Sequence, residues 1–237
     1  DLDISNRMES ALERGEFQLY LQPKVSLSTR SVVGAEALVR WRDPQGGFVE
    51  PDVFIPVLER NGFITQLDLY MFEQGCLCLR RGMDCGVPPL PISVNFSRVN
   101  LGRDILSRFR QLQEKWSVPP ELLEFEFTET LVAENPQFFA ELVQEIHRCG
   151  FHCSIDDFGS GYSSLHMLQQ VPADTLKLDK SLFDGLLDAD LRPRSELVVR
   201  SVLEMARQLG MTTVAEGISE EAQLSALERL PCDMVQG

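Results

Sequence analysis

Acidic and amide side chains recur where short apolar segments of this chain end. Strands buried on both faces of a parallel sheet normally read as continuous apolar runs, so each polar interruption needs a reason. Glu36 interrupts Val33–Arg40 and shares one face with Leu38 and Arg40, because side chains alternate along a strand. In a β/α barrel, the carboxyl ends of the strands form the active site. The polar residues concerned are Glu36, Asn95, Glu124, Glu126, Asp156, Asp157, Lys177, Asp179 and Glu216.

Converging carboxylates at one barrel mouth predict a metal site. A buried carboxylate without a partner is costly or becomes protonated, and Lys177 and Arg40 supply too few cations for five acids. Carboxylate and amide oxygens are the ligands that Mg²⁺ and Mn²⁺ prefer, and the absence of His and Cys from the set argues against Zn²⁺.

The adjacent pair Asp156-Asp157 is the sharpest local signal. Neighbouring residues on a strand point in different directions, but a turn at the strand end can direct both toward a pair of ions. Two cations about 3.5–4 Å apart can activate water and stabilise displacement at phosphorus. Gly159 and Gly161 follow and predict a tight active-site loop, with Ser163 and Ser164 as caps of the next helix.

The elements that position these residues follow a repeated order of strand and helix, which predicts an α/β fold. The first two strands are joined by only about six residues, Ser26–Ser31, too few for a parallel crossover, so we expect them to be antiparallel. The prediction is a (β/α)8 TIM-like barrel with an antiparallel first strand, and an open doubly wound sheet is the alternative. The sequence ends at the last predicted strand, so the helix that should follow it is absent or not covered. The eight strands are expected at Phe17–Val25, Val32–Trp41, Pro91–Phe96, Leu122–Phe127, His152–Ile155, Thr175–Leu178, Thr212–Ala215 and Asp233–Gln236. The helices are expected at Val53–Asn61, Thr65–Arg81, Gly102–Trp116, Gln137–Cys149, Ser163–Gln170, Ser195–Leu209 and Glu220–Leu230.

Composition limits the functions that the chain can have. A net charge of −14 over 237 residues argues against binding DNA through a broad basic surface. An anionic substrate then requires bound cations that reverse the charge locally. No apolar run reaches the roughly 20 residues that span a bilayer, so we expect no direct membrane contact. The six cysteines are expected to be free thiols in a reducing cytoplasm, and the three histidines form no recognised metal motif.

The motifs resemble those of the EAL-domain family of cyclic di-GMP phosphodiesterases, over about residues 16–237. Each motif falls in the order found in that family. The matching motifs are Gln22-Pro23, Glu36-Ala37-Leu38, Ser93-Val94-Asn95, Glu126-Phe127-Thr128-Glu129, Asp156-Asp157-Phe158-Gly159, Lys177-Leu178-Asp179, Ala215-Glu216-Gly217 and Gln236-Gly237.

The resemblance implies a role for each matching residue. Lys177 orients or activates the attacking water, Glu216 contacts the metal–water cluster or Lys177, and Glu59 and Gln236 are further polar site residues. Glu129 steadies the loop after Asp157, and Glu124 lies outside the site. The implied metal ligands, for two ions of Mg²⁺ or Mn²⁺, are Glu36, Asn95, Glu126, Asp156 and Asp157. The implied substrate contacts are Gln22, Leu38, Arg40 and Asp179.

The implied activity is hydrolysis of cyclic di-GMP to linear pGpG in bacterial signalling. The chain begins at Asp1 and not at Met, which indicates an excised domain or a processed fragment. We expect residues 1–237 to be one barrel domain, excised from a larger protein with covalently linked sensory or GGDEF-type domains. The resemblance further implies a homodimer in the cytoplasm, or in the cytoplasmic part of a membrane-anchored protein. Phe127, where the family commonly has Leu, and a long Leu187–Ser195 stretch depart from the family pattern without touching a ligand.

Three other functions fit parts of the pattern. A catalytically silent cyclic di-GMP receptor would keep the fold and lose metal ligands, but no ligand position is changed here. A barrel glycosidase would use Glu126 or Glu129 with Glu216, which leaves Asp156, Asp157, Asn95 and Lys177 without a role. An enolase-like barrel with Mg²⁺ and a lysine base fits Lys177 and the acids but not the series of motifs.

Overall fold

A computed structural model of the chain describes residues 2–44, 46–100, 105–161 and 165–237. The chain divides into two compact units, which are described separately below. The first comprises Asp1–Gln22 and Glu36–Leu123, and the second Pro23–Ala35 and Glu124–Gly237. The boundary crosses β1 (Phe17–Ser26) and β2 (Val32–Arg42), so each of these strands contributes to both units.

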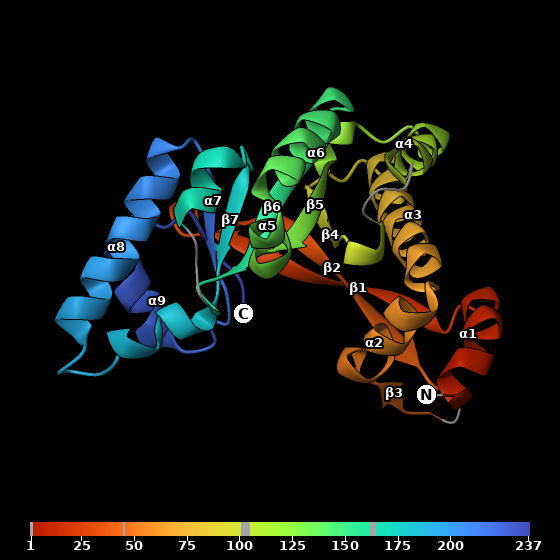
Figure 1. Ribbon diagram of the computed structural model, residues 1–237, viewed down its shortest axis with the longest axis horizontal. Helices are drawn as coiled ribbons and strands as arrows, with labels where there is room; N and C mark the ends of the chain where they lie inside the picture. The colour runs from red at the N-terminus through yellow and green to blue at the C-terminus, as the bar shows by residue number, and fades with distance from the viewer. Residues whose placement is uncertain (1, 45, 101–104, 162–164) are drawn as a thin grey trace. The chain divides into compact units, whose positions relative to one another are not determined.

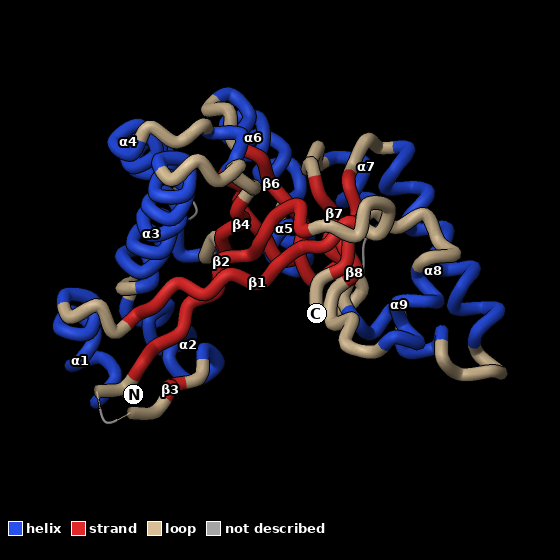
Figure 2. Tube along the Cα trace, turned by 180° about the vertical axis from the view of Figure 1, so that it is seen from behind, coloured by secondary structure: helices blue, strands red, loops and turns tan. Residues whose placement is uncertain are grey.

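The hairpin of β1 and β2 confirms the expected antiparallel first strand. The two strands pair, and the Ser26 amide donates to the Ser31 carbonyl across the turn. At the other end of the hairpin the Arg42 amide donates to the Glu16 carbonyl. Figure 2 shows the two strands side by side. A turn of this length leaves only the antiparallel arrangement.

The second unit contains the strands that carry most of the predicted site. Its order is β1-β9-β8-β7-β6-β5, and β1 is antiparallel to β9, with Val25 opposite Val235. The remaining neighbours are parallel, so their carboxyl ends meet at one edge. The strands are β5 (Leu123–Thr128), β6 (His152–Phe158), β7 (Thr175–Leu178), β8 (Thr212–Ala215) and β9 (Met234–Val235).

Helices cover these strands and close a core against them. Figure 1 shows α6 beside β6, and α8 packs against β8. Leu203 of α8, Leu178 of β7 and Ala215 of β8 are fully buried in one apolar cluster, which removes their surface from water and stabilises the packing of helix on sheet. The helices are α5 (Glu129–Glu134), α6 (Pro136–Arg148), α7 (Leu165–Gln170), α8 (Arg192–Gln208) and α9 (Glu221–Leu227), with short 3₁₀ turns η3 (Lys180–Leu182) and η4 (Asp184–Leu186).

The first unit has its own core, built around Trp41. The Trp41 ring lies 5.1 Å from that of Phe17 and 5.5 Å from that of Phe54, and its Nε1 donates to Glu16 Oε2 at 3.0 Å. The strand order is β4-β2-β3. The elements besides β1 and β2 are α1 (Leu2–Glu13), β3 (Phe48–Val49), α2 (Pro51–Asn61), α3 (Ile64–Asp84), β4 (Ile92–Asn95), η1 (Arg98–Asn100), α4 (Ile105–Trp116) and η2 (Pro120–Leu122).

All eight predicted strands are present, and each predicted helix overlaps an observed one. The predicted starts of two helices, at residues 102–104 and 163–164, lie outside the described residues. The prediction missed α1, although Ile4, Met8 and Ala11 have helical spacing, and it missed the short elements β3 and α5. Among the helices described, none is both long and apolar enough to cross a membrane.

Candidate functional site

A buried lysine lies at the centre of an acidic cluster in the second unit. Lys177 of β7 has no exposed surface. Its Nζ lies 2.8 Å from Glu126 Oε2, 3.0 Å from Asp156 Oδ1 and 2.9 Å from Glu216 Oε1. These four residues come from neighbouring strand ends, β5 to β8, as predicted from the sequence. A buried charge needs such partners, because its desolvation is otherwise very costly.

A bulge at the end of β6 directs two adjacent aspartates to one side. The register between β6 and β7 shifts between Ile155 and Phe158, and Asp157 has a left-handed backbone with φ of 59°. The Asp157 amide donates to Asp156 Oδ1 at 2.9 Å. Strain of this kind in a residue other than glycine is typical of functional sites. The bulge and the left-handed backbone together explain how Asp156 and Asp157, although adjacent, can serve one site.

The chemistry of this cluster fits a hard divalent cation. Carboxylate oxygens of Asp156, Asp157 and Glu216 lie within 4.8 Å of one another. Burial raises the pKa of Asp156 to about 8; Lys177 opposes the rise, and Glu126, Glu216 and Asp157 add to it. Several carboxylates thus gather around Lys177, and a divalent cation would offset part of their negative charge.

Glu129 supports the loop that follows the aspartates. Its Oε2 accepts a hydrogen bond from the Gly159 amide at 2.9 Å, and the glutamate is buried. Gly159 has φ of 98°, and a Cβ there would lie 2.5 Å from Leu182. The position therefore requires glycine both for its backbone and for its space. Glu129 therefore contacts the loop that it was expected to support, and its role there stays a prediction. The predicted caps Ser163 and Ser164 lie outside the described residues.

Lys24 is a member of the cluster that the sequence analysis missed. Its Nζ lies 3.2 Å from Glu126 Oε1, and the side chain is buried. Alternation along β1 places Lys24 on the same face as Gln22, and this signal was available in the sequence. Glu126 is thus held between two lysines, one on each carboxylate oxygen.

The two other predicted residues of the second unit have backbone or capping contacts. Asp179 follows β7, and its Oδ1 accepts from the Ser181 amide at 2.9 Å, which caps η3. Gln236 follows β9 and is buried. Its backbone amide donates to the carbonyl of Ala215, the residue before Glu216. Both residues therefore lie at the same strand ends as the cluster.

The remaining predicted metal ligands belong to the first unit, where they form a pair. Asn95 Nδ2 donates to Glu36 Oε1 at 3.2 Å, which joins the end of β4 to the middle of β2. Two residues after Asn95, Ser97 Oγ donates to Glu59 Oε1 at 3.1 Å. Asp68, which the sequence analysis did not identify, accepts from the Ser97 amide at 3.2 Å and from Asn100 Nδ2 at 2.6 Å.

The three predicted substrate contacts of the first unit lie on β1 and β2. Gln22 and Leu38 are half-buried. The Arg40 guanidinium lies over the Tyr20 ring at 5.9 Å and donates to the Val39 carbonyl at 2.9 Å. Its remaining donors suit an anionic group such as a phosphate.

Comparison with known proteins identifies the family. The sequence model of the EAL domain family matches residues 5–237 of the chain. A cyclic di-GMP phosphodiesterase of Pseudomonas aeruginosa, NbdA, is 35% identical over the whole chain, which covers 30% of NbdA. A second from that organism, RocR, is 34% identical over 95% of the chain, which covers 57% of RocR. The chain thus spans about a third to a little over half of these relatives.

Solved structures give the same result for the fold. The PaMucR phosphodiesterase in complex with c-di-GMP has a TM-score of 0.90 and 32% identity, over 99% of this chain and 94% of that one. The predicted fold class, an α/β TIM-like barrel with an antiparallel first strand, is confirmed by this likeness and by the antiparallel pairing of β1 with β9.

Proposed function

Because this chain belongs to the EAL domain family, we propose that it is a metal-dependent phosphodiesterase that hydrolyses cyclic di-GMP to linear 5′-pGpG. The observation that carries the proposal is the buried Lys177 held by three carboxylates at the strand ends. NbdA and RocR, which bear the name of this activity, support the choice of substrate.

The predicted metal ligands are Glu126, Asp156 and Asp157 in the second unit and the paired Glu36 and Asn95 in the first. We propose Mg²⁺ or Mn²⁺, two per site, because every donor is a carboxylate or amide oxygen. When bound, the ions would neutralise charge on the phosphodiester and favour ionisation of the attacking water.

The chain's own residues position the reactants. Lys177 orients the water once one of its three carboxylate partners releases an N–H donor, while Glu216, 2.9 Å from Nζ, holds the ammonium in place. Gln22, Leu38, Arg40 and Asp179 are proposed to contact the substrate, with Glu59 and Gln236 as further polar groups of the site. The linear product keeps a 5′ phosphate, so water adds to phosphorus and the bond to the 3′ oxygen breaks.

A turnover assay with Mn²⁺ or Mg²⁺ tests the proposal directly. We expect purified protein to convert cyclic di-GMP to pGpG, and Glu36→Ala to abolish turnover because a predicted ligand is lost. Val33→Ala, on the same strand, is the matched control and should remain active. Tight binding of cyclic di-GMP without turnover in either metal would favour the receptor, and wild-type rates in Glu36→Ala would place the site elsewhere.

The oligomeric state, the location and the linked domains of the protein are also proposals. We infer a homodimer in the cytoplasm, with sensory or GGDEF-type domains covalently linked to the barrel. One relative, 33% identical over the whole chain, is the bifunctional diguanylate cyclase/cyclic di-GMP phosphodiesterase MucR, of which the chain covers 34%. Sedimentation of the domain and of the full-length protein tests the dimer, and a single monomeric species at all concentrations would contradict it.

A further inference from the structure

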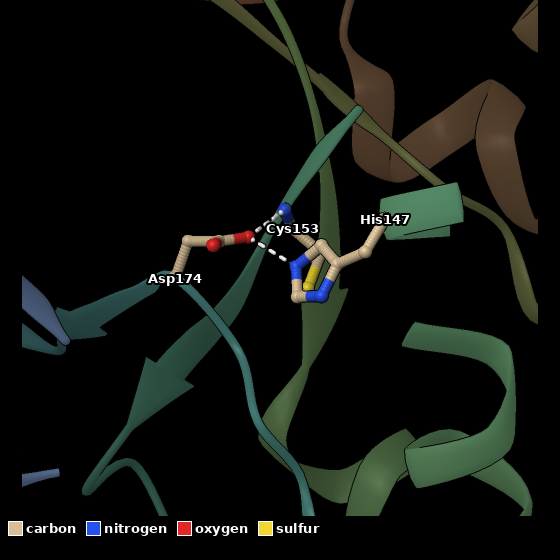
Figure 3. Close-up of side chains that lie close together, drawn as sticks. All are labelled: His147, Cys153 and Asp174. Atoms are coloured by element: carbon tan, nitrogen blue, oxygen red, sulfur yellow. Dashed lines mark hydrogen bonds and ion pairs between the residues drawn. The ribbon is translucent and has the colours of Figure 1, made fainter. Parts of the chain in front are cut away.

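Three side chains with metal-binding donors meet at the amino ends of β6 and β7. They are His147 in the last turn of α6, Cys153 of β6, and Asp174 directly before β7. One donor atom from each lies within 4.8 Å of the other two. Figure 3 shows the His147 ring and the Cys153 side chain together beside the Asp174 carboxylate. His147 Nε2 and the Cys153 amide each lie 2.8 Å from Asp174 Oδ2.

We propose that His147, Cys153 and Asp174 form a second metal site, for zinc or a cation with similar ligand preferences. Imidazole and thiolate are borderline or soft donors and favour such cations over Mg²⁺ and Mn²⁺. The proposal is independent of the phosphodiesterase function, because the carboxylate cluster lies at the opposite, carboxyl ends of the same strands.

The local fold brings the three residues together and leaves an approach from solvent. Gly150, with φ of 84°, ends α6 and turns the chain back into β6, which places His147 beside Cys153. The side chains of His147 and Asp174 are 35% and 32% exposed, whereas Cys153 is fully buried behind them. Three protein donors leave one position for water in a four-coordinate ion.

A purely structural role for Asp174 does not account for the histidine. Asp174 Oδ2 accepts from the Cys153 amide and ties β6 to the start of β7. Asp233 does the same for β8, where its Oδ2 accepts from the Thr213 amide at 2.8 Å. There the second partner is the Thr213 hydroxyl at 2.8 Å, with no histidine. An aspartate can therefore hold a strand end without His147.

A second histidine lies next to the proposed site. His152 Nδ1 is 3.4 Å from Asp174 Oδ1, on the other oxygen of the carboxylate. A carboxylate that binds a metal through one oxygen and a histidine through the other is held in a fixed orientation, as in many metal sites. His152 is therefore expected to position Asp174 and not to bind the ion itself.

Titration with Co²⁺ tests the proposal without reference to activity, because a thiolate bound to cobalt gives a charge-transfer band in the near ultraviolet. Excess Mg²⁺ is present throughout to occupy the carboxylate cluster. We expect one equivalent of Co²⁺ to produce the band, and Zn²⁺ to displace it. Cys153→Ser should abolish the band, and His147→Gln should weaken Co²⁺ binding by about 10-fold or more.

Matched controls separate this site from others on the chain. Cys85→Ser removes an exposed thiol and His166→Gln an exposed imidazole, and both should keep the band at wild-type affinity. Asp157→Asn alters the carboxylate cluster and should also keep it. If the wild type gives no band, or Cys153→Ser retains it, the proposal is wrong. Should Cys153→Ser fail to fold, unchanged affinity in His147→Gln would overturn it equally.

Discussion

Lys177 is a fully buried charged residue, and its three carboxylate partners offset the cost of its desolvation. Replacing it by Met leaves the acids without their shared cation. Removing one member of a buried ionic network costs about 3–5 kcal/mol. We expect Lys177→Met to lower the free energy of unfolding of the metal-free protein by about that amount, measured by urea denaturation.

The same substitution should lower turnover of cyclic di-GMP by at least about 100-fold, because the group that orients the water is lost. Lys180→Met is the matched control, since Lys180 is exposed and three residues away. Its rate should remain near that of the wild type. A Lys177→Met rate within about threefold of the wild type would remove Lys177 from the mechanism.

Asp68 provides a pH-dependent prediction in the first unit. Burial raises its pKa to about 7, although hydrogen bonds from the Ser97 amide and Asn100 oppose the rise and Glu59 adds to it. The folded protein therefore holds this proton more tightly than the unfolded chain, whose Asp pKa is about 3.9. The stabilisation from proton binding is complete below about pH 4 and is lost as the pH rises through about 7.

Asp68→Asn removes this titration while its side-chain oxygen can still accept both hydrogen bonds. We expect the stability of the wild type relative to Asp68→Asn to fall by about 4 kcal/mol between pH 4 and 8. Urea denaturation at a series of pH values measures the difference. Parallel curves for the two proteins would show that Asp68 ionises normally.

At the scale of elements, a buried contact supports the bulge of β6 and the loop that follows it. Glu129 at the start of α5 holds the Gly159 amide, and Gly159 follows Asp157 by two residues. Losing this acceptor leaves the loop free to move the aspartates. We expect Glu129→Ala to weaken Mg²⁺ binding and turnover by about 10–100-fold, as seen when groups behind metal ligands are removed.

Glu129→Gln is the informative partner of that variant, because its amide oxygen can still accept from Gly159. It should lie between Glu129→Ala and the wild type in Mg²⁺ affinity, measured by calorimetry. Equal losses in the two variants would mean that the charge of Glu129 matters and not its hydrogen bond.

Part of the site could be predicted from patterns within single strands of the sequence, and part could not. Alternation along β2 placed Glu36 on the predicted site face, and alternation along β5 placed Glu124 and Glu126 together, because a period of two is visible within one strand. The family resemblance, and not the alternation, separated Glu126 from Glu124. The partners of these residues are not visible in this way: Lys24 lies 102 positions from Glu126. His147, Cys153 and Asp174 were not identified as a group, because their spacing follows from the turn after α6 and the pairing of β6 with β7. Short elements such as β3 and α5 have too few residues to show a period.

At the scale of the whole molecule, the chain has a net charge of −14, and part of that charge is gathered around the strand ends. Self-repulsion of this kind destabilises a folded protein, so an ion that binds only the folded state should stabilise it. We expect Mg²⁺ at about 100 times its dissociation constant to raise the free energy of unfolding by about 2.7 kcal/mol relative to protein in chelator.

A matched variant and a matched salt distinguish site binding from general screening. KCl at the same ionic strength screens all charges, so it should produce less stabilisation than Mg²⁺. Asp157→Asn removes one carboxylate from the cluster, and asparagine tolerates the left-handed backbone at this position. The variant should therefore fold normally and lose most of the specific Mg²⁺ effect while keeping the response to KCl. Equal stabilisation of both proteins by Mg²⁺ would show that the ion acts on the surface charge as a whole and not at the carboxylates of β6 and β8.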